Sequence, residues 1–254
     1  MASCGCALGI GTDIGGSIRI PAHFNGIFGF KPTPDRVTYK DVSSPAIRRK
    51  GGETNIRPAP GPLARCADDL VLVMRAFLQE PMWMEDPTLP RQPWREERFQ
   101  DKKRLTIGYY TNDHWFPSAP ACQRAVKEAA EALERMGHKL VPYEPIDVNE
   151  AVRLFVAITQ ADGSQHFLQS FENEKINSRY TPVLQNVMVP NCLRSTVARI
   201  LRFIGEDRNA LIVESVGSKT AYQYFDLIID LQFYIERWLE DMRKNHIDLI
   251  LVMN

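Results

Sequence analysis

The segment at residues 9–21, GIGTDIGGSIRIP, contains residue types that could perform acyl transfer. Paired glycines reach backbone conformations that other residues cannot, and such turns cradle phosphates, bind dinucleotides or form an oxyanion hole beside a nucleophile. The phosphate alternative lacks the lysine of a G-x-x-x-x-G-K-[ST] loop, because Ile18 follows Ser17. The dinucleotide alternative has a G-x-G at positions 9–11, but the third glycine is misplaced and Pro21 interrupts the long helix that would hold a pyrophosphate.

An oxyanion hole beside a nucleophile fits the segment better. Successive backbone N–H groups can converge into a nest, and small side chains let a substrate carbonyl approach that nest. One such donor is typically worth about 3–4 kcal/mol of transition-state stabilisation. The predicted donors are the backbone N–H groups of Ile14, Gly15, Gly16 and Ser17, with the Ser17 hydroxyl beside the carbonyl carbon. From the turn alone, a plain glycine-rich turn with a surface serine is the simpler interpretation.

A longer match makes the interpretation specific. GTDIGGSIRIPA at 11–22 resembles the second half of the amidase signature, the motif of serine hydrolases that use a Ser-Ser-Lys triad, and the similarity continues through GIFGFKPT and GPLAR. Later segments resemble the fatty-acid amide hydrolase branch: EDPTLPRQPWREERF, IGYY, ADGSQHFLQSF and the final IDLILVM. The resemblance implies an α/β fold, a mixed β-sheet surrounded by helices, with residues 1–254 as one partial amidase-signature domain that is incomplete at both ends.

The resemblance also implies a mechanism. Ser17 takes the position of the acylated nucleophile, and Asp13 and Arg19 take positions that hold the loop. The implied substrate is a lipid amide, either a fatty-acid primary amide or an N-acylethanolamine, which is hydrolysed to free acid and amine through an acyl-enzyme. No metal site and no organic cofactor are implied.

The groups that activate the serine in this family are not found before Ser17. A serine hydroxyl needs a base, and in the family an upstream lysine acts through a second serine in a GGSSGG-type segment. The residues before Ser17 include no lysine, and ASCGCA does not match that segment. Neither Lys31 nor the histidines form a recognisable triad pattern. We therefore expect a fragment, a truncated isoform or an incomplete gene model. The alternative function is a catalytically incomplete chain that binds lipid or membrane, or pairs with a partner such as a second copy in a homodimer.

A second signal lies at about residues 190–216. Apolar residues share one helical face there, and basic residues surround it: Leu193, Val197, Ile200, Leu201 and Ile204, with Arg194, Arg199, Arg202 and Arg208. Such a segment can lie in a membrane interface or pack its apolar face on the core. The segment falls where fatty-acid amide hydrolases carry a membrane-binding cap, so we expect contact with a membrane surface.

Four apolar residues fall at positions that line the acyl channel of the family: Val183, Ile212, Val213 and Val216. Apolar side chains there suit a lipid tail. Thr159 and Gln160 depart from the family pattern, because bulky apolar residues are usual at their positions. That departure favours a shorter or more polar amide.

Composition excludes some partners and compartments. Lys+Arg and Asp+Glu are both 31, so no net field attracts nucleic acid, and we expect no nucleic-acid partner. Five scattered cysteines without a secretory signal indicate reduced thiols and an intracellular protein. No apolar run is long enough to span a bilayer. With the family resemblance, we expect a peripheral protein on the cytoplasmic face of endomembranes.

Short strands and amphipathic helices must position the glycine turn. We predict a buried strand at 7–11 that leads into the turn, followed by turn and irregular structure at 18–30. A helix is predicted to begin at Ala67, because acidic residues occupy its first turn and apolar residues recur at helical spacing.

The second half of the chain shows a different order of elements. A strand at 105–110, a helix at 119–136 and a strand at 138–143 make the strand–helix–strand order of an α/β arrangement. Helical patterns dominate 150–244, and the final IDLILV is a buried-strand pattern.

Overall fold

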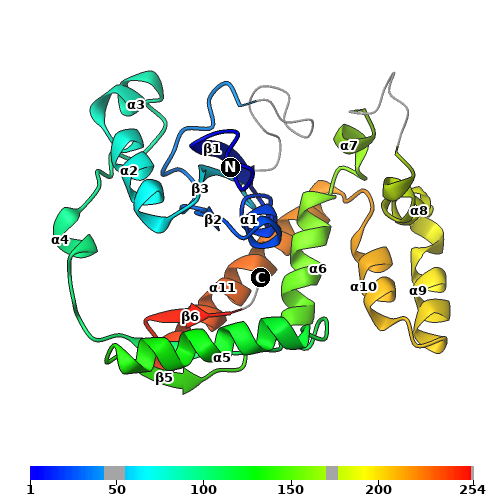
Figure 1. Cartoon of the computed structure of the whole chain (residues 1–254). Coiled ribbons are helices and arrows are strands. Elements are labelled where there is room, and N and C mark those ends of the chain that lie inside the picture. The colour runs from blue at the N-terminus through cyan, green and yellow to red at the C-terminus, as the bar shows by residue number, and fades with distance from the viewer. Residues whose placement is uncertain (43–54, 170–176, 253–254) are drawn as a thin grey trace. The chain divides into compact units, whose positions relative to one another are not determined.

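The computed structural model describes residues 1–42, 55–169 and 177–252. The chain divides into two units, Met1–Lys102 and Lys103–Met253, and each is considered by itself (Figure 1). The first unit contains an antiparallel sheet and the second a parallel sheet with most of the helices. The predicted α/β class, with mixed strand pairing and surrounding helices, is confirmed.

The sheet of the first unit has the strand order β1-β3-β2. Its strands are β1 (Leu8–Asp13), β2 (Phe28–Gly29) and β3 (Ala59–Ala64), and all six residues of the central β3 are buried. The predicted strand before the turn is confirmed, but it is not buried: Leu8 is 43% and Ile10 52% exposed. The reason is that, among the strands that the structure describes, β1 pairs with β3 alone and forms an edge of the sheet.

A helix stands where irregular structure was predicted. Residues Arg19–Asn25 form α1, and Gly26 ends it with a left-handed φ of 62°. Pro21 is the third residue of α1, within the first turn. N–H groups there have no partner inside a helix, so proline costs no hydrogen bond. The prediction of turn and irregular structure at 18–30 was therefore wrong for this stretch.

The described residues of the first unit also form α2 (Ala67–Phe77), α3 (Glu80–Glu85) and α4 (Glu96–Phe99). The predicted helix from Ala67 is confirmed. Buried residues gather in clusters within the described part of this unit. One consists of Val37, Met74, Leu78, Trp83 and Leu89. Another consists of Ile18, Ala22 and Leu63, and it lies directly beneath the glycine turn.

The second unit has a parallel sheet of strand order β5-β4-β6. The strands are β4 (Thr106–Tyr109), β5 (Lys139–Pro142) and β6 (Leu249–Leu251), and α5 (Pro120–Arg135) connects β4 to β5. These elements confirm the predicted strand–helix–strand order and the final strand. In β6, Leu249 is exposed rather than buried.

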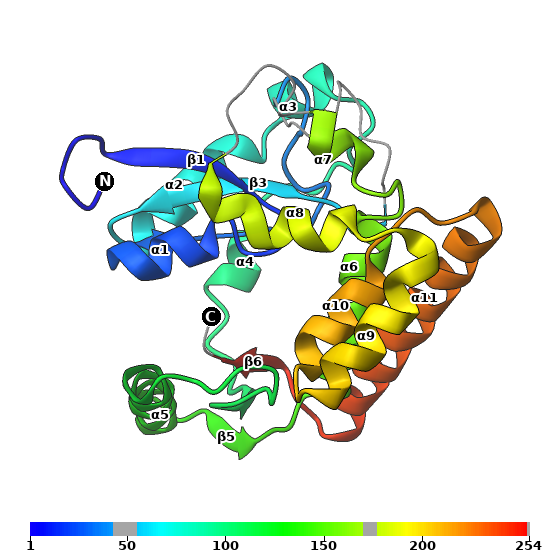
Figure 2. The same cartoon turned by 90° about the vertical axis from the view of Figure 1, so that its right-hand side faces the viewer.

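Helices fill the chain between β5 and β6. They are α6 (Val148–Thr159), α7 (Gln165–Gln169), α8 (Thr181–Met188), α9 (Arg194–Phe203), α10 (Asp207–Ser215) and α11 (Ala221–Lys244), with 3-10 turns at Ser178–Tyr180 and Asn191–Leu193. Helices α9 and α10 run side by side (Figures 1 and 2). Among the described residues, no helix combines the length and apolar character that crossing a bilayer requires.

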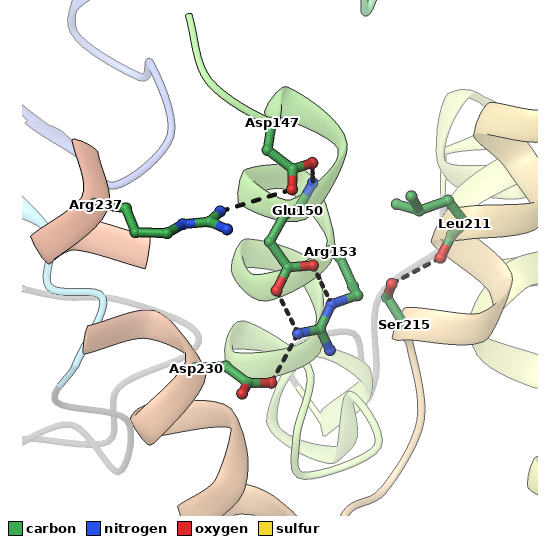
Figure 3. A network of polar contacts seen from close by, with 7 residues as sticks. All are labelled: Asp147, Glu150, Arg153, Leu211, Ser215, Asp230 and Arg237. Atoms are coloured by element: carbon green, nitrogen blue, oxygen red, sulfur yellow. Dashed lines mark hydrogen bonds and ion pairs between the residues drawn. The ribbon is translucent and has the colours of Figure 1, made fainter. Parts of the chain in front are cut away.

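A ladder of charged side chains joins α6 to α11 (Figure 3). Asp147 caps α6 by accepting the Glu150 N–H at 3.2 Å, and Arg153 pairs with Glu150 at 2.6 Å. The other side of the ladder comes from α11, where Asp230 lies 2.9 Å from Arg153 and Arg237 lies 3.7 Å from Asp147. Oppositely charged groups therefore face each other at two levels of the helix pair.

Candidate active site

The loop that carries Ser17 is built around the buried side chain of Asp13. Asp13 is the last residue of β1, and its side chain is 0% exposed. Its Oδ1 accepts the Gly16 N–H at 2.6 Å, and its Oδ2 accepts the N–H groups of Ile18 at 3.2 Å and Arg19 at 3.3 Å. The Arg19 guanidinium donates to both oxygens, from Nε at 2.9 Å and from Nη2 at 3.1 Å. One carboxylate thus fixes both ends of the turn.

The Asp13 carboxylate is ionised in this setting. Burial raises its pKa, but the hydrogen bonds from Arg19 and from the backbone N–H groups of Gly16 and Ile18 outweigh burial and hold the pKa well below its usual range. The same hydrogen bond raises the pKa of Arg19. The expected loop-holding contact between these two residues is therefore present.

Gly16 has a backbone conformation that favours glycine. Its φ is 125°, in the region that side chains rarely tolerate. A Cβ on this residue would lie 2.5 Å from Ile20 Cδ1 and 2.8 Å from Ile20 Cγ1. A side chain at this position would therefore require the Ile20 side chain to move, in addition to the unfavourable φ.

Ser17 is exposed between two buried neighbours, Gly16 and Ile18. Ile18 is 0% exposed and packs in the cluster beneath the turn. Because the chain is anchored on both sides of Ser17, the turn carries this residue at the surface.

The four predicted oxyanion donors are not equivalent. The Gly16 N–H donates to Asp13. Within the described part of the chain, no hydrogen bond from the N–H of Ile14, Gly15 or Ser17 is present. Three of the four groups are therefore available to a ligand in this conformation, and the role of all four stays a prediction.

No base touches the Ser17 hydroxyl among the described residues of the first unit. Lys31 is half-buried, and burial lowers its pKa while the charge of Asp13 raises it. Its Nζ donates to the Pro32 carbonyl at 3.5 Å, in agreement with a role within the turn that contains it.

The predicted acyl-channel residues lie on helices of the second unit. Val213 and Val216 are 2% and 5% exposed and Ile212 is half-buried, all at the C-terminal end of α10. Val183 belongs to α8, but its side chain lies outside the described residues. Thr159 and Gln160, the two residues that depart from the family pattern, form hydrogen bonds within their own segment. Thr159 Oγ1 donates to the Phe155 carbonyl at 2.6 Å, and the Gln160 side chain accepts from Ser164.

The segment expected to contact membrane has a different charge distribution from the one predicted. Arg194 is only 7% exposed and bonds to carbonyl groups, so its predicted place among the basic residues around the apolar face was wrong. Arg202 pairs with Glu214 at 2.8 Å. The apolar side is exposed as expected at Leu193, Ile200 and Ile204, and it also includes Phe203, 92% exposed, which the sequence pattern did not single out.

Comparisons with known proteins extend over nearly the whole chain. A family model described as Amidase matches residues 1–252. Fatty-acid amide hydrolase 1 of Sus scrofa is 32% identical over 252 residues, which cover 99% of this chain and 43% of that protein. Amidase 1 of Gibberella moniliformis (strain M3125 / FGSC 7600) is 34% identical over 186 residues, which cover 72% of this chain and 34% of that protein.

A solved structure of fatty acid amide hydrolase superposes with a TM-score of 0.75 at 25% identity, over 96% of this chain and 38% of that one. The chain therefore spans less than half the length of these relatives. The family resemblance and the fold expected from the sequence are both confirmed.

Proposed function

The chain belongs to the amidase family, and we propose that it carries the nucleophile of a serine amidase at Ser17. The observation that carries this proposal is the loop itself. A buried, ionised Asp13 fixes both ends of the turn, while Ser17 is exposed beside backbone N–H groups that have no protein acceptor among the described residues.

The proposed reaction proceeds through an acyl-enzyme. The Ser17 oxygen attacks the amide carbonyl carbon and loses its proton to a base, and the carbonyl oxygen becomes an oxyanion. In this proposal the N–H groups of Ile14, Gly15 and Ser17, which have no acceptor among the described residues, stabilise that charge, at about 3–4 kcal/mol for a donor of this kind. Collapse of the tetrahedral intermediate breaks the C–N bond and releases the amine with a proton. Water then attacks the ester carbon, which frees the acid and restores the hydroxyl.

A fluorophosphonate probe tests the nucleophile, because it reacts covalently with activated serines. We expect the folded chain to be labelled and the Ser17→Ala variant to be unlabelled. Ser195→Ala is the matched control, since Ser195 is an exposed serine on α9. Labelling that persists in Ser17→Ala, or folded wild-type protein that takes up no probe, contradicts the assignment.

The proposed substrate is a fatty-acid amide. Two observations support a lipid tail: the match to fatty-acid amide hydrolases and the apolar side chains at the end of α10. The polar Thr159 and Gln160, together with relatives described as amidase and acetamidase, favour a shorter amide. Competition for the probe between acetamide and a long-chain primary amide distinguishes the two classes.

We also propose that α8 and α9 contact a membrane surface. Five exposed apolar side chains support this: Met188, Leu193, Ile200, Phe203 and Ile204. Apolar side chains gain free energy when they leave water for the acyl boundary of a bilayer. We expect liposome flotation of the wild type to be lost in the double variant Ile200→Glu/Phe203→Glu. The control is Tyr222→Glu/Phe225→Glu, which changes exposed residues of α11. Equal flotation of both variants excludes this surface.

One observation favours a second function, a chain that binds lipid amides without turning them over. No described side chain of the first unit contacts the Ser17 hydroxyl to act as a base. Probe labelling that is slow, combined with lipid binding and no release of amine, is the result expected for that alternative.

A further inference from the structure

Arg194 is a buried cation that contacts three helical segments. It is the first residue of α9 and is 7% exposed. Its Nη1 donates to the carbonyls of Asn186 at 3.0 Å and Val213 at 3.2 Å, its Nη2 to the carbonyl of Val187 at 3.0 Å, and its Nε to Asn191 Oδ1 at 3.1 Å. Two of these carbonyls belong to α8 and one to α10.

All partners of this guanidinium among the described residues are uncharged oxygens. The carbonyls of Asn186, Val187 and Val213 stand in the last turns of α8 and α10. Such carbonyls lack partners inside a helix and form the negative end of the helix dipole. Arg194 therefore satisfies orphan acceptors of two helices at once. Burial lowers its pKa, and no ion pair offsets that cost.

The surroundings of Arg194 are shaped to receive it. Gly217 has a φ of 118°, and a Cβ there would lie 2.7 Å from Arg194 Nε. The Asn191 side chain accepts from Arg194 and donates from Nδ2 to Ser218 Oγ at 2.8 Å. The connection after α10 thus leaves open the space that the guanidinium occupies.

We propose that Arg194 is a positioning residue that fixes α8 and α10 in one relative placement and thereby sets the acyl-chain preference of the apolar residues that these two helices carry. The inference rests on the proposed function, since it takes α8 and α10 as the helices that meet the acyl chain. The carbonyl bonded to Arg194 belongs to Val213, a proposed channel residue that is itself buried. In this proposal a change in the contact shifts α10, which carries Val213 and leads into Val216.

A lysine cannot replace this contact. The planar guanidinium spreads its donors over a rigid fork, whereas an ammonium directs three donors from one point. The oxygens around Arg194 come from α8, α10 and the turn before α9, and they engage all three nitrogens of the guanidinium at once. Arg194→Lys keeps the positive charge, but its ammonium group cannot donate to all of these oxygens at the same time.

Binding of fatty acids by the full chain tests the proposal. Displacement of dansyl-labelled undecanoate by hexanoate, decanoate and hexadecanoate measures chain-length preference. For the wild type we expect hexadecanoate to compete at least about tenfold better than hexanoate. In Arg194→Lys we expect that ratio to fall to about one, because the two helices lose their fixed placement. A merely stabilising contact would instead weaken the binding of all three acids together and leave the ratio unchanged.

Two further variants keep the test decisive. Asn191→Ala removes only the acceptor of Nε, so an intermediate ratio is expected even if Arg194→Lys does not fold. Arg199→Lys, an exposed position on the same helix, is the control and should keep the wild-type ratio. A wild-type ratio in folded Arg194→Lys, or in Asn191→Ala where Arg194→Lys does not fold, overturns the positioning role. A wild type that binds none of the three acids refutes the proposed acyl site itself, and with it this inference.

Discussion

Replacement of Asp13 by asparagine should release the loop that carries Ser17. The carboxylate accepts five hydrogen bonds from Gly16, Ile18 and Arg19. Asparagine keeps one acceptor oxygen, but its NH₂ group would face N–H donors on the other side. Removal of one partner of a buried ion pair costs about 3–5 kcal/mol. Since Arg19 is 43% exposed and can be hydrated, we take the lower end, about 3 kcal/mol.

A loss of that size is measurable in two ways. With a urea slope of about 2 kcal/mol/M, the unfolding midpoint of the first unit should fall by about 1.5 M. Hydrogen exchange followed by mass spectrometry should show faster exchange at the N–H groups of Gly16, Ile18 and Arg19. The control is Glu85→Gln, at the solvent-exposed pair with Lys40, and it should leave the midpoint unchanged. If Asp13→Asn matches Glu85→Gln in both measurements, the loop is not held by Asp13 and the reasoning fails.

Three other predictions follow from the same structure. The folded-state pKa of Asp13 is depressed, so the stability that its carboxylate contributes is present above the unfolded pKa of about 4 and is lost as pH falls below it. The urea midpoint should therefore fall less steeply from neutral to acid pH in Asp13→Asn than in the wild type. Gly16→Ala forces a side chain into a positive φ and against Ile20, at a cost of about 1–3 kcal/mol, and should abolish probe labelling of Ser17 if that loop must keep its shape. Asp230→Asn removes the ion pair between Arg153 of α6 and Asp230 of α11. Because Asp230 is 48% exposed, the free energy of unfolding should fall by less than about 1 kcal/mol, as chemical denaturation would measure.

Local patterns in the sequence were sufficient where the contacts are local. The helix from Ala67 and the β4–α5–β5 order follow from periodicity and turn residues over short stretches, and the structure contains them. The loop contacts of Asp13 and Arg19 span six positions, and the family motif places both residues in that loop. The α1 helix was missed because Pro21 reads as a breaker, although its effect depends on its place in the first turn.

Arg194 shows why the remainder was not predictable. In an amphipathic pattern an arginine beside an apolar face indicates solvent exposure. Three of its partners are backbone carbonyl oxygens of Asn186, Val187 and Val213, supplied by two other helices, and the fourth is the side-chain oxygen of Asn191. Backbone carbonyls carry no residue-specific signal, because every residue has one. A buried arginine whose partners are mostly such groups therefore leaves little trace in the sequence pattern around it.

Catalysis by Ser17 requires both that the loop present the hydroxyl and that a base remove its proton, and the contacts of the loop concern the first requirement. The polar contacts described for the loop come from nearby residues, chiefly the Asp13 carboxylate, whereas the buried Ile18 packs on the more distant Leu63. None of them is a base for the hydroxyl. The described contacts of the loop therefore present the hydroxyl without including a base. If no base contacts Ser17, as among the described residues of the first unit, labelling of Ser17 should accelerate as hydroxide concentration rises, whereas a resident base would make the rate level off above its own pKa.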